Sequence, residues 1–238
     1  MKNALILAAG RSSRFGRNKL EEKFDGETLP FIAAKFALEN GAKNIYLTLS
    51  RSAIKTDGKR VYHPVLEEVS RICDPVVRFQ SEETYGPGAA ITTWAGILEE
   101  PFTVLFGDNL YLGEMPDWMT RNLSSSDQQD VIFTTRRSLV NPRNLQLAAV
   151  VNNYVIEKPH GRLEGNFFCG FARFPQGYLS RVGDLRKSDR GEVEITDMIN
   201  MSENCQSWDI QRDLGVIWAD LTYEADCARI RELLYEGK

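Results

Sequence analysis

Apolar and polar positions along the chain fall into two repeating patterns, one typical of buried strands and one typical of helices. Leu5, Ile6 and Leu7 form a continuous apolar run, which predicts a strand covered on both faces. Residues 28–41 place apolar side chains at helical spacing and stop at Gly41, a favourable C-terminal cap. The later predicted elements are strands at 44–50, 75–80, 102–109 and 165–175, helices at 63–72 and 89–98, and a strand followed by a helix start within 215–226.

Strand-like and helix-like segments therefore alternate along the chain, without repeats or low-complexity tracts. This order predicts an α/β fold with a mixed, mainly parallel sheet flanked by helices, of Rossmann-like type. No segment has the composition of a linker, so residues 1–238 are expected to form a single domain.

The segment after the first predicted strand concentrates small residues, hydroxyls and cations. Small residues at 8–10 allow another group to approach the backbone closely, and four cations with two serines follow within nine residues. This combination predicts an oligophosphate site. Neither GxxxxGK[ST] nor GxGxxG is present, so the ATPase and dinucleotide loops fit poorly. The alternative is a strand followed by a solvated basic loop.

Composition and charge restrict the class of ligand. The net charge is −4, with 42% hydrophobic and 26% charged residues, which is ordinary for a globular protein. The cations are local, so we expect a small polyanion and no nucleic acid. No apolar run is long enough for a signal peptide or a membrane span, so we expect a cytoplasmic protein without a membrane partner. The four cysteines form no CxxC and are expected to be reduced and structural.

The stretch LAAGRSSRFGRNK at 7–19 resembles the signature loop of nucleotidyltransferases, in which the pattern runs LAAGxSxRFGxxK. The resemblance implies the nucleotide-diphospho-sugar transferase fold, with a part that binds a nucleoside triphosphate (NTP) at about 1–110 and a part that binds a phosphorylated acceptor at about 111–238. It makes Arg14 and Lys19 the catalytic cations, with Lys23 ranking second to Lys19. The NTP-binding residues that we assign to the loop are Leu7, Ala8, Ala9, Gly10, Arg11, Ser12 and Ser13.

A second glycine-rich segment, GPGAA at 86–90, predicts a tight turn that opens a helix with small residues. It is similar to a GxxxA segment that contacts the nucleobase in nucleotidyltransferases, which implies base contact for Gly88 and Ala89. We favour a pyrimidine base. The alternative is a turn that only starts the helix.

Two aspartates are candidate metal ligands. Asp108 follows a buried strand and Gly107, at the carboxyl end where open α/β sheets bind ligands, and phosphoryl chemistry there needs a hard cation such as Mg²⁺. The family carries GD at this place, with the aspartate on the metal. WADLTYEAD at 218–226 resembles the family's WxDxGTxED, which implies Asp220 as the second ligand. Leu221 and Thr222 depart from that pattern, and Thr222 is expected to cap a helix. The alternatives are an aspartate that closes a turn or caps a helix at 108, and a surface turn at 220.

The acceptor side is indicated by three further segments. VIEKPHGR at 155–162 resembles the family's EKP segment, which implies that Glu157 binds sugar hydroxyls and Lys158 the acceptor phosphate. The strand around Gly170 is expected to line the acceptor pocket. GEVEITD at 191–197 resembles a segment of the sugar-linked branch of the family, which implies that Glu194 binds an acceptor hydroxyl or amine. The alternatives are a solvated charge pair at 157–158 and helix capping by Thr196.

The resemblance implies an enzyme of the EC 2.7.7 type: an acceptor phosphate, most simply that of a sugar 1-phosphate, attacks the α-phosphorus and pyrophosphate leaves. Neither histidine lies in a triad or metal-ligand pattern, so electrostatics from the cations and Mg²⁺ should dominate. Three alternatives stay open: a cytidylyltransferase for phosphocholine, a phospho-amino acid or a polyol phosphate; a non-catalytic nucleotide sensor; and a glycosyltransferase, which would predict DxD where this chain has GDN. The base, the acceptor and the oligomeric state are undetermined, and a homo-oligomer is compatible with the sequence.

Overall fold

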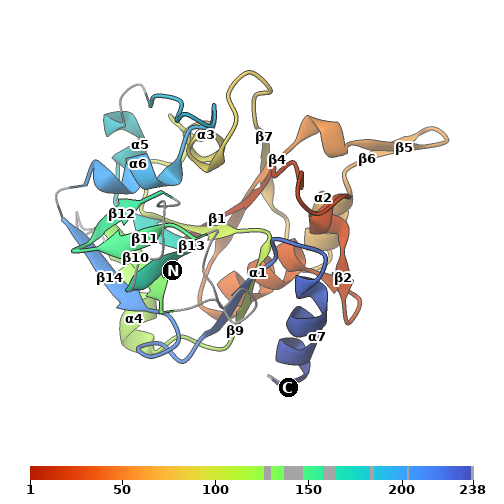
Figure 1. Ribbon diagram of the computed structural model, residues 1–238. Coiled ribbons are helices and arrows are strands. Elements are labelled where there is room, and N and C mark those ends of the chain that lie inside the picture. The colour runs from red at the N-terminus through yellow and green to blue at the C-terminus, as the bar shows by residue number, and fades with distance from the viewer. Residues whose placement is uncertain (126–129, 137–146, 158–164, 183–184, 203, 237–238) are drawn as a thin grey trace.

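The computed structural model describes residues 1–238 except 126–129, 137–146, 158–164, 183–184, 203 and 237–238. Within these residues the chain builds a large mixed sheet with helices on both faces (Figure 1). The parallel strands are β1 (Asn3–Ala8), β4 (Asn44–Leu49), β7 (Val76–Phe79) and β8 (Phe102–Phe106), in the spatial order β8-β1-β4-β7. The antiparallel side is β13 (Asn166–Phe174), which pairs with β8, then β11 (Ala149–Val151) and β12 (Tyr154–Ile156). Strands β10 (Asp130–Thr135) and β14 (Cys205–Asp209) extend the sheet beside β13.

The side chains of β1 explain the layered arrangement. Ala4, Ile6 and Ala8 point into one hydrophobic cluster, whereas Leu5 belongs to another on the opposite face. Successive strand residues face opposite sides, so a continuous apolar run produces a strand that is buried on both. Helices α1 (Leu29–Glu39), α2 (Pro64–Val69) and α4 (Asp117–Ser124) pack on the first face, and α3 (Pro87–Thr92), α5 (Tyr178–Arg181) and α6 (Ile195–Asn200) on the second. The predicted mixed, mainly parallel sheet flanked by helices is confirmed.

A smaller antiparallel pair extends from the end of the main sheet. Strand β9 (Asn109–Leu112) pairs with β15 (Ile217–Asp220), and their apolar residues pack against α7 (Asp226–Glu236) in a third cluster. The short strands β2 (Lys23–Phe24) and β3 (Glu27–Thr28) form a hairpin that contributes Phe24 to this cluster. Strands β5 (Lys55–Asp57) and β6 (Arg60–Tyr62) form a second hairpin, which projects from the body in Figure 1, and the 3₁₀ turns η1 (Lys19–Glu21) and η2 (Arg51–Ala53) complete the described elements.

The strand β12 lies at the edge of the main sheet and is covered by one side chain. The carboxamide of Asn200 accepts from the Val155 N–H at 2.8 Å and donates to the Val155 carbonyl at 2.7 Å. These are the two hydrogen bonds that a neighbouring strand would otherwise supply. Asn200 therefore ends the sheet at β12.

Most predicted elements exist, but the helices predicted at 63–72 and 89–98 end early, at Val69 and Thr92, and the cap predicted at Thr222 is wrong. The helix predicted at 89–98 is α3, which stops at Thr92; turns follow, and Gly96 adopts a φ of +75° that a helix excludes. Thr222 does not cap a helix. The α7 helix begins at Asp226, whose carboxylate accepts from the backbone N–H groups of Thr222 at 3.0 Å and Tyr223 at 2.6 Å. No helix in the described part of the chain is long and apolar enough to cross a membrane.

Candidate active site

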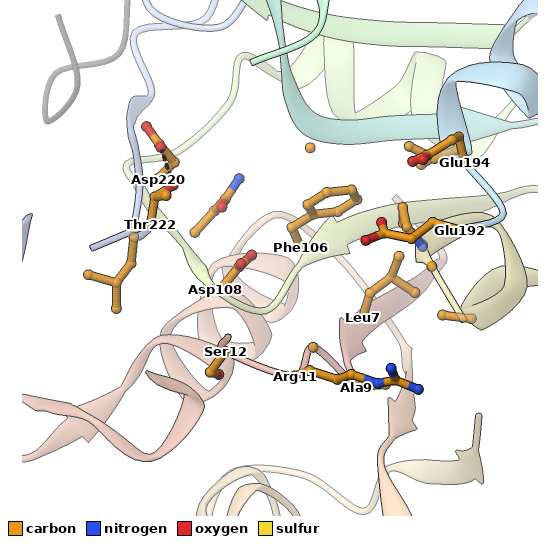
Figure 2. Close-up of a pocket in the computed structure, with 18 of the residues that line it drawn as sticks. Leu7, Ala9, Arg11, Ser12, Phe106, Asp108, Glu192, Glu194, Asp220 and Thr222 are labelled. Carbon is orange, nitrogen blue, oxygen red and sulfur yellow. Dashed lines mark hydrogen bonds between the residues drawn. The ribbon is translucent and has the colours of Figure 1, made fainter. Parts of the chain in front are cut away.

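A pocket of about 290 Å³ opens at the carboxyl ends of the central strands β1 and β8. Its lining comes from the loop after β1, the turn before α3, the ends of β8 and β13, the segment 190–195 and the end of β15. Figure 2 shows Asp108, Asp220 and Thr222 toward one end of this pocket and Glu192 and Glu194 toward the other. Segments far apart in the sequence therefore meet at the edge of the sheet where open α/β folds bind ligands.

The loop after β1 forms the floor of the pocket. Of the residues predicted there, Leu7, Ala9, Gly10, Arg11, Ser12, Ser13 and Arg14 line the pocket. Ala8 does not, because it points into the core and is buried. Ser12 has a φ of +53°, and its hydroxyl accepts from the Lys19 N–H at 3.1 Å, which closes the loop on itself. A left-handed residue within a turn produces the concave backbone that binds anions.

The two predicted catalytic cations both line the pocket but differ in their surroundings. Arg14 is exposed, and within the described residues its guanidinium has no ion-pair partner. Lys19 is largely buried; its ammonium lies 2.5 Å from Asp108 Oδ2 and donates to the Leu221 carbonyl at 2.8 Å. Lys23, the second choice, pairs with Glu68 at 2.7 Å and is not part of the lining.

Asp108 and Asp220 are adjacent because β9 and β15 are paired. Asp220 stands opposite Asn109 in the register, and the Leu221 N–H donates to the Asp108 carbonyl at 3.2 Å. Opposed residues in an antiparallel ladder have Cα atoms about 4.5–5.5 Å apart. Asp220 is buried, and its Oδ2 accepts from the Thr222 hydroxyl at 3.0 Å, which orients the carboxylate. The two predicted metal ligands therefore lie on neighbouring positions of one ladder.

The two carboxylates suit Mg²⁺ better than they suit a metal whose ligands all come from protein side chains. No group of three or more His, Cys, Asp or Glu side chains that could hold a metal is present among the residues the structure describes. Mg²⁺ is commonly held by one or two carboxylates, with waters and substrate phosphates as the other ligands. Two carboxylates beside a loop with a concave backbone meet that requirement.

The side of the pocket predicted to meet the nucleobase is formed by other residues than expected. Gly88 and Ala89 do not line the pocket, whereas Gly86, Pro87 and Ala90 do. Gly88 packs against the backbone of Glu194, where a Cβ would lie 2.7 Å from the Glu194 carbonyl oxygen. Gly88 and Ala89, predicted to contact the base, therefore lie outside the pocket lining, beside residues of the same turn that belong to it.

Gln80, at the carboxyl end of β7, also lines this side of the pocket. Its Nε2 donates to the carbonyls of Gly86 at 2.9 Å and Thr84 at 3.4 Å. Carbonyls only accept, so these contacts fix the orientation of the amide and leave Oε1 as its acceptor. Sequence reasoning missed Gln80, although a polar residue at the end of a predicted strand is a detectable signal.

Glu157 and Glu194 meet at the opposite side of the pocket through Arg190, which sequence reasoning missed. The Arg190 guanidinium contacts Glu194 at 2.6 Å, Glu157 at 3.0 Å and Glu192 at 3.7 Å. Burial alone would lower the pKa of Arg190, but the hydrogen bond with Glu194 and the charges of the three glutamates raise it overall. The Arg190 guanidinium is thus a cation held among three carboxylates.

The start of α6 shows that the predicted helix cap at Thr196 is wrong. Glu194 itself precedes the first turn of α6 without a side-chain cap, and Thr196 lies inside the helix, so Thr196 is not the cap. The Glu194 carboxylate is almost fully buried and accepts from the Ser188 hydroxyl at 2.8 Å. Lys158 lies outside the described residues.

Gly170, predicted to line the acceptor pocket, belongs to the lining of this pocket, and a Cβ at this position would clash with its neighbours. It has a φ of +67°, and a Cβ would lie 2.8 Å from the Phe106 ring and 2.9 Å from Asn109 Nδ2. Asn109 donates to the neighbouring Cys169 carbonyl at 3.1 Å and lines the pocket. The close approach of β13 to β9 therefore depends on glycine at this position.

The buried hydroxyl of Tyr111 supports the same junction from beneath. It accepts from the Phe106 N–H at 3.2 Å and donates toward the Gly170 carbonyl at 3.1 Å. Burial raises the pKa of this phenol well above its ordinary value, and the nearby Cys169 adds to the shift. Tyr111 therefore stays protonated and acts as a fixed structural donor.

Comparison with known proteins gives one family match and one curated relative. Residues 4–149 match the family described as the MobA-like NTP transferase domain. A UTP–glucose-1-phosphate uridylyltransferase, AglF, of Haloferax volcanii is 25% identical over 132 residues, which are 53% of this chain and 54% of the relative. The alignment thus spans about half the length of that relative.

Solved structures match over nearly the whole chain. A putative glucose-1-phosphate thymidylyltransferase from Bacillus anthracis has a TM-score of 0.77 at 16% identity, covering 98% of this chain and 95% of the other. A UDP-glucose pyrophosphorylase in complex with UDP-glucose has a TM-score of 0.74 at 17% identity, with 100% of both chains covered. An inositol-1-phosphate CTP transferase from T. maritima has a TM-score of 0.71 at 18% identity, covering 99% and 96%. At these identities the likeness shows a shared fold.

Proposed function

The chain belongs to the family of MobA-like NTP transferase domains, and from this we propose that it transfers a nucleoside monophosphate from an NTP to a phosphorylated acceptor with release of pyrophosphate. The observation that carries the proposal is the adjacency of Asp108 and Asp220 next to Lys19 in a single pocket. Binding alone would not require two oriented carboxylates among phosphate-binding cations. A sugar 1-phosphate is the acceptor we favour, because the Haloferax volcanii relative and the Bacillus anthracis protein are both named for glucose 1-phosphate.

The triphosphate lies, in this proposal, over the loop at 9–14. Backbone N–H groups of the loop and the side chains of Ser12 and Ser13 donate to phosphate oxygens. Arg14 is exposed and unpaired within the described chain, so it binds the triphosphate without first losing a partner. The small residues Ala9 and Gly10 leave the backbone accessible to the ligand.

Asp108 and Asp220 would hold Mg²⁺ in this proposal. The ion, when bound, offsets negative charge on the phosphates and favours the departure of pyrophosphate. Lys19, which lies beside Asp108, would donate to an oxygen of the α-phosphate. Thr222 keeps Asp220 in orientation, because its hydroxyl donates to Oδ2.

The acceptor lies on the side of Arg190. An acceptor phosphate needs a cation, and Arg190 is the described cation on this side, with Lys158 a predicted second one. Glu157 and Glu194 accept hydrogen bonds from acceptor hydroxyls, since ionised carboxylates only accept. The acceptor phosphate is dianionic near neutral pH and needs little general-base help, which agrees with a lining that holds no histidine among the residues the structure describes.

For the base we keep the pyrimidine preference as a prediction. Gln80 Oε1 is an acceptor for a donor on the base edge, and Gly86 and Pro87 lie beside it. The cytoplasmic location and the oligomeric state also stay predictions.

The test is a pyrophosphate-release assay with each of the four common NTPs against glucose 1-phosphate, inositol 1-phosphate and phosphocholine. We expect release with one NTP and a sugar phosphate, dependent on Mg²⁺, and loss of release in Asp220→Asn. Asp57→Asn is the matched control, because Asp57 lies on the exposed β5–β6 hairpin outside the pocket. Binding of an NTP without release from any pair would identify a nucleotide sensor and contradict the proposal.

A further inference from the structure

Tyr85 contacts both sides of the pocket, and the proposed function gives it no part in binding either substrate. Its hydroxyl accepts from the Arg11 backbone N–H at 3.0 Å, and the Arg11 guanidinium lies over its ring at 4.2 Å from the ring centre. Arg11 belongs to the loop at 9–14. The side chain of Tyr85 is therefore attached to the segment proposed to bind the triphosphate.

The backbone of Tyr85 is attached to the acceptor side. The Tyr85 carbonyl accepts from the Val193 N–H at 2.7 Å, and Tyr85 forms a parallel bridge with Glu192. The Gly88 N–H donates to the Val193 carbonyl at 2.8 Å, and Lys187 Nζ donates to the Glu83 carbonyl at 3.1 Å. The segments 83–88 and 187–194 thus form one hydrogen-bonded unit.

The two segments of this unit are in close contact at Gly86. A Cβ at Gly86 would lie 2.4 Å from the Val193 carbonyl oxygen, and the residue has a φ of +119°. A displacement of Tyr85 must therefore be shared by Val193 and by Glu194 beside it. The link to Arg11, in contrast, lies at the surface, where one hydrogen bond and a cation–π contact hold it.

We propose that Tyr85 is a positioning residue that couples the triphosphate loop to the acceptor-binding segment. Ligation of phosphate at 9–14 fixes Arg11; Arg11 fixes Tyr85; and Tyr85 fixes the backbone of Val193 next to Glu194. Substrate binding at the two sides is then cooperative, since a ligand that orders one side lowers the cost of ordering the other. The inference rests on the proposed function, because it takes the 9–14 loop as the phosphate site.

The test is amide hydrogen exchange with inorganic tripolyphosphate and Mg²⁺ as the probe. This probe has no base and no acceptor group, so it loads the phosphate loop alone. In the wild type we expect slower exchange in the peptide covering 9–14 and also, by about fivefold, in the peptide covering 187–194. In Tyr85→Phe, which keeps the ring but lacks the hydroxyl, the protection of 9–14 should persist and that of 187–194 should be lost.

Tyr62→Phe is the matched control. Tyr62 also carries a stacked arginine, Arg60, but lies on the exposed β6 strand away from the pocket, so this variant should respond like the wild type. Direct contact of tripolyphosphate with Arg190 would protect 187–194 equally in Tyr85→Phe, and that result would overturn the proposal. Protection of 9–14 without any change at 187–194 in the wild type would also overturn it, while leaving the proposed function intact. No protection at 9–14 would overturn both.

Discussion

The Lys19 ammonium lies 2.5 Å from Oδ2 of Asp108, and the same ammonium donates to the backbone carbonyl of Leu221 at 2.8 Å. One cation thus links the loop after β1 to both strands of the β9–β15 pair. A positive charge therefore stands beside the Asp108 carboxylate. The arrangement keeps two acidic groups close to each other at a position where phosphates must also approach.

Replacing Lys19 should lower turnover more than it lowers binding. For Lys19→Met we expect a fall in kcat of roughly 10²–10³, the usual effect of removing one preorganised donor. Steady-state kinetics at saturating substrates measures it. Lys55→Met is the control, because Lys55 pairs with Glu21 outside the pocket. Near-full turnover in Lys19→Met would remove Lys19 from the catalytic residues.

Removal of divalent metal should abolish activity reversibly. We expect EDTA to stop pyrophosphate release and Mg²⁺ to restore it, and Asp108→Asn to require a higher Mg²⁺ concentration for half-maximal rate, because one charged oxygen ligand is lost. Asp57→Asn on the hairpin should keep the wild-type Mg²⁺ dependence. Undiminished activity in EDTA, or an unchanged Mg²⁺ titration in Asp108→Asn, would contradict the two-aspartate site.

Arg190 should affect the acceptor and spare the nucleotide. For Arg190→Met we expect the KM of the acceptor to rise about 10- to 100-fold, which is the effect of losing a hydrogen bond to a charged group, with the KM of the NTP unchanged. For Arg190→Lys, which keeps the charge, the KM of the acceptor should lie between those of the wild type and Arg190→Met. Arg121→Met is the control, because Arg121 is exposed on α4. Equal changes in both KM values would instead indicate a general loss of structure around Glu194.

Gly170→Ala should destabilise the fold more than Gly177→Ala. Both glycines have a positive φ, +67° and +64°, so both variants carry the backbone cost of about 1–2 kcal/mol. At Gly170 the new Cβ meets the Phe106 ring and Asn109 Nδ2 within 3.0 Å, whereas at Gly177 the nearest atom is 3.7 Å away. We expect a further loss of about 1–3 kcal/mol at Gly170 in urea unfolding. Equal losses would show that β13 and β9 adjust without strain.

Stability should fall when the solution is acidified through the titration of His63. Burial lowers the pKa of this side chain below its ordinary value of 6.5, so the folded state holds the neutral form. The unfolded chain takes up a proton first, so stability is complete above pH 6.5 and declines as the pH falls toward the lowered pKa. Urea unfolding between about pH 7.5 and about pH 5 should show a decline below about 1.4 kcal/mol per pH unit. His63→Gln should be less stable at neutral pH but show a shallower decline, and an equally steep decline in that variant would assign the effect to other groups.

The sequence predicts the parts of this site that depend on local patterns. The buried strand, the small residues and the cations at 5–19 are contiguous, so their chemistry can be inferred without knowledge of the fold. Asp108 follows the same logic, because a carboxylate directly after a buried strand lies at the edge of the sheet. The elements at 28–41, 44–50 and 165–175 are strongly periodic and correspond to α1, β4 and β13.

The remaining parts depend on contacts between distant segments. The adjacency of Asp220 and Asp108 comes from the β9–β15 register, and nothing in the local sequence sets that register. Arg190 stands directly before the GEVEITD segment, yet its contacts to three glutamates depend on where β12 and α6 meet. The α3 helix is shorter than its sequence predicts because the apolar spacing continues through turns after Thr92, up to Leu98.

The carboxamide of Asn200 on the Val155 backbone has a consequence for behaviour at high concentration. Tyr154 and Ile156 expose apolar side chains on this edge strand, and Val151 does so on the neighbouring β11, so the edge would be a template for a strand of another molecule. With both backbone groups of Val155 already bonded, an incoming strand must first displace Asn200. Asn200 thus opposes edge-to-edge aggregation at β12. An apolar sheet edge without this side chain would be more prone to pair with other molecules.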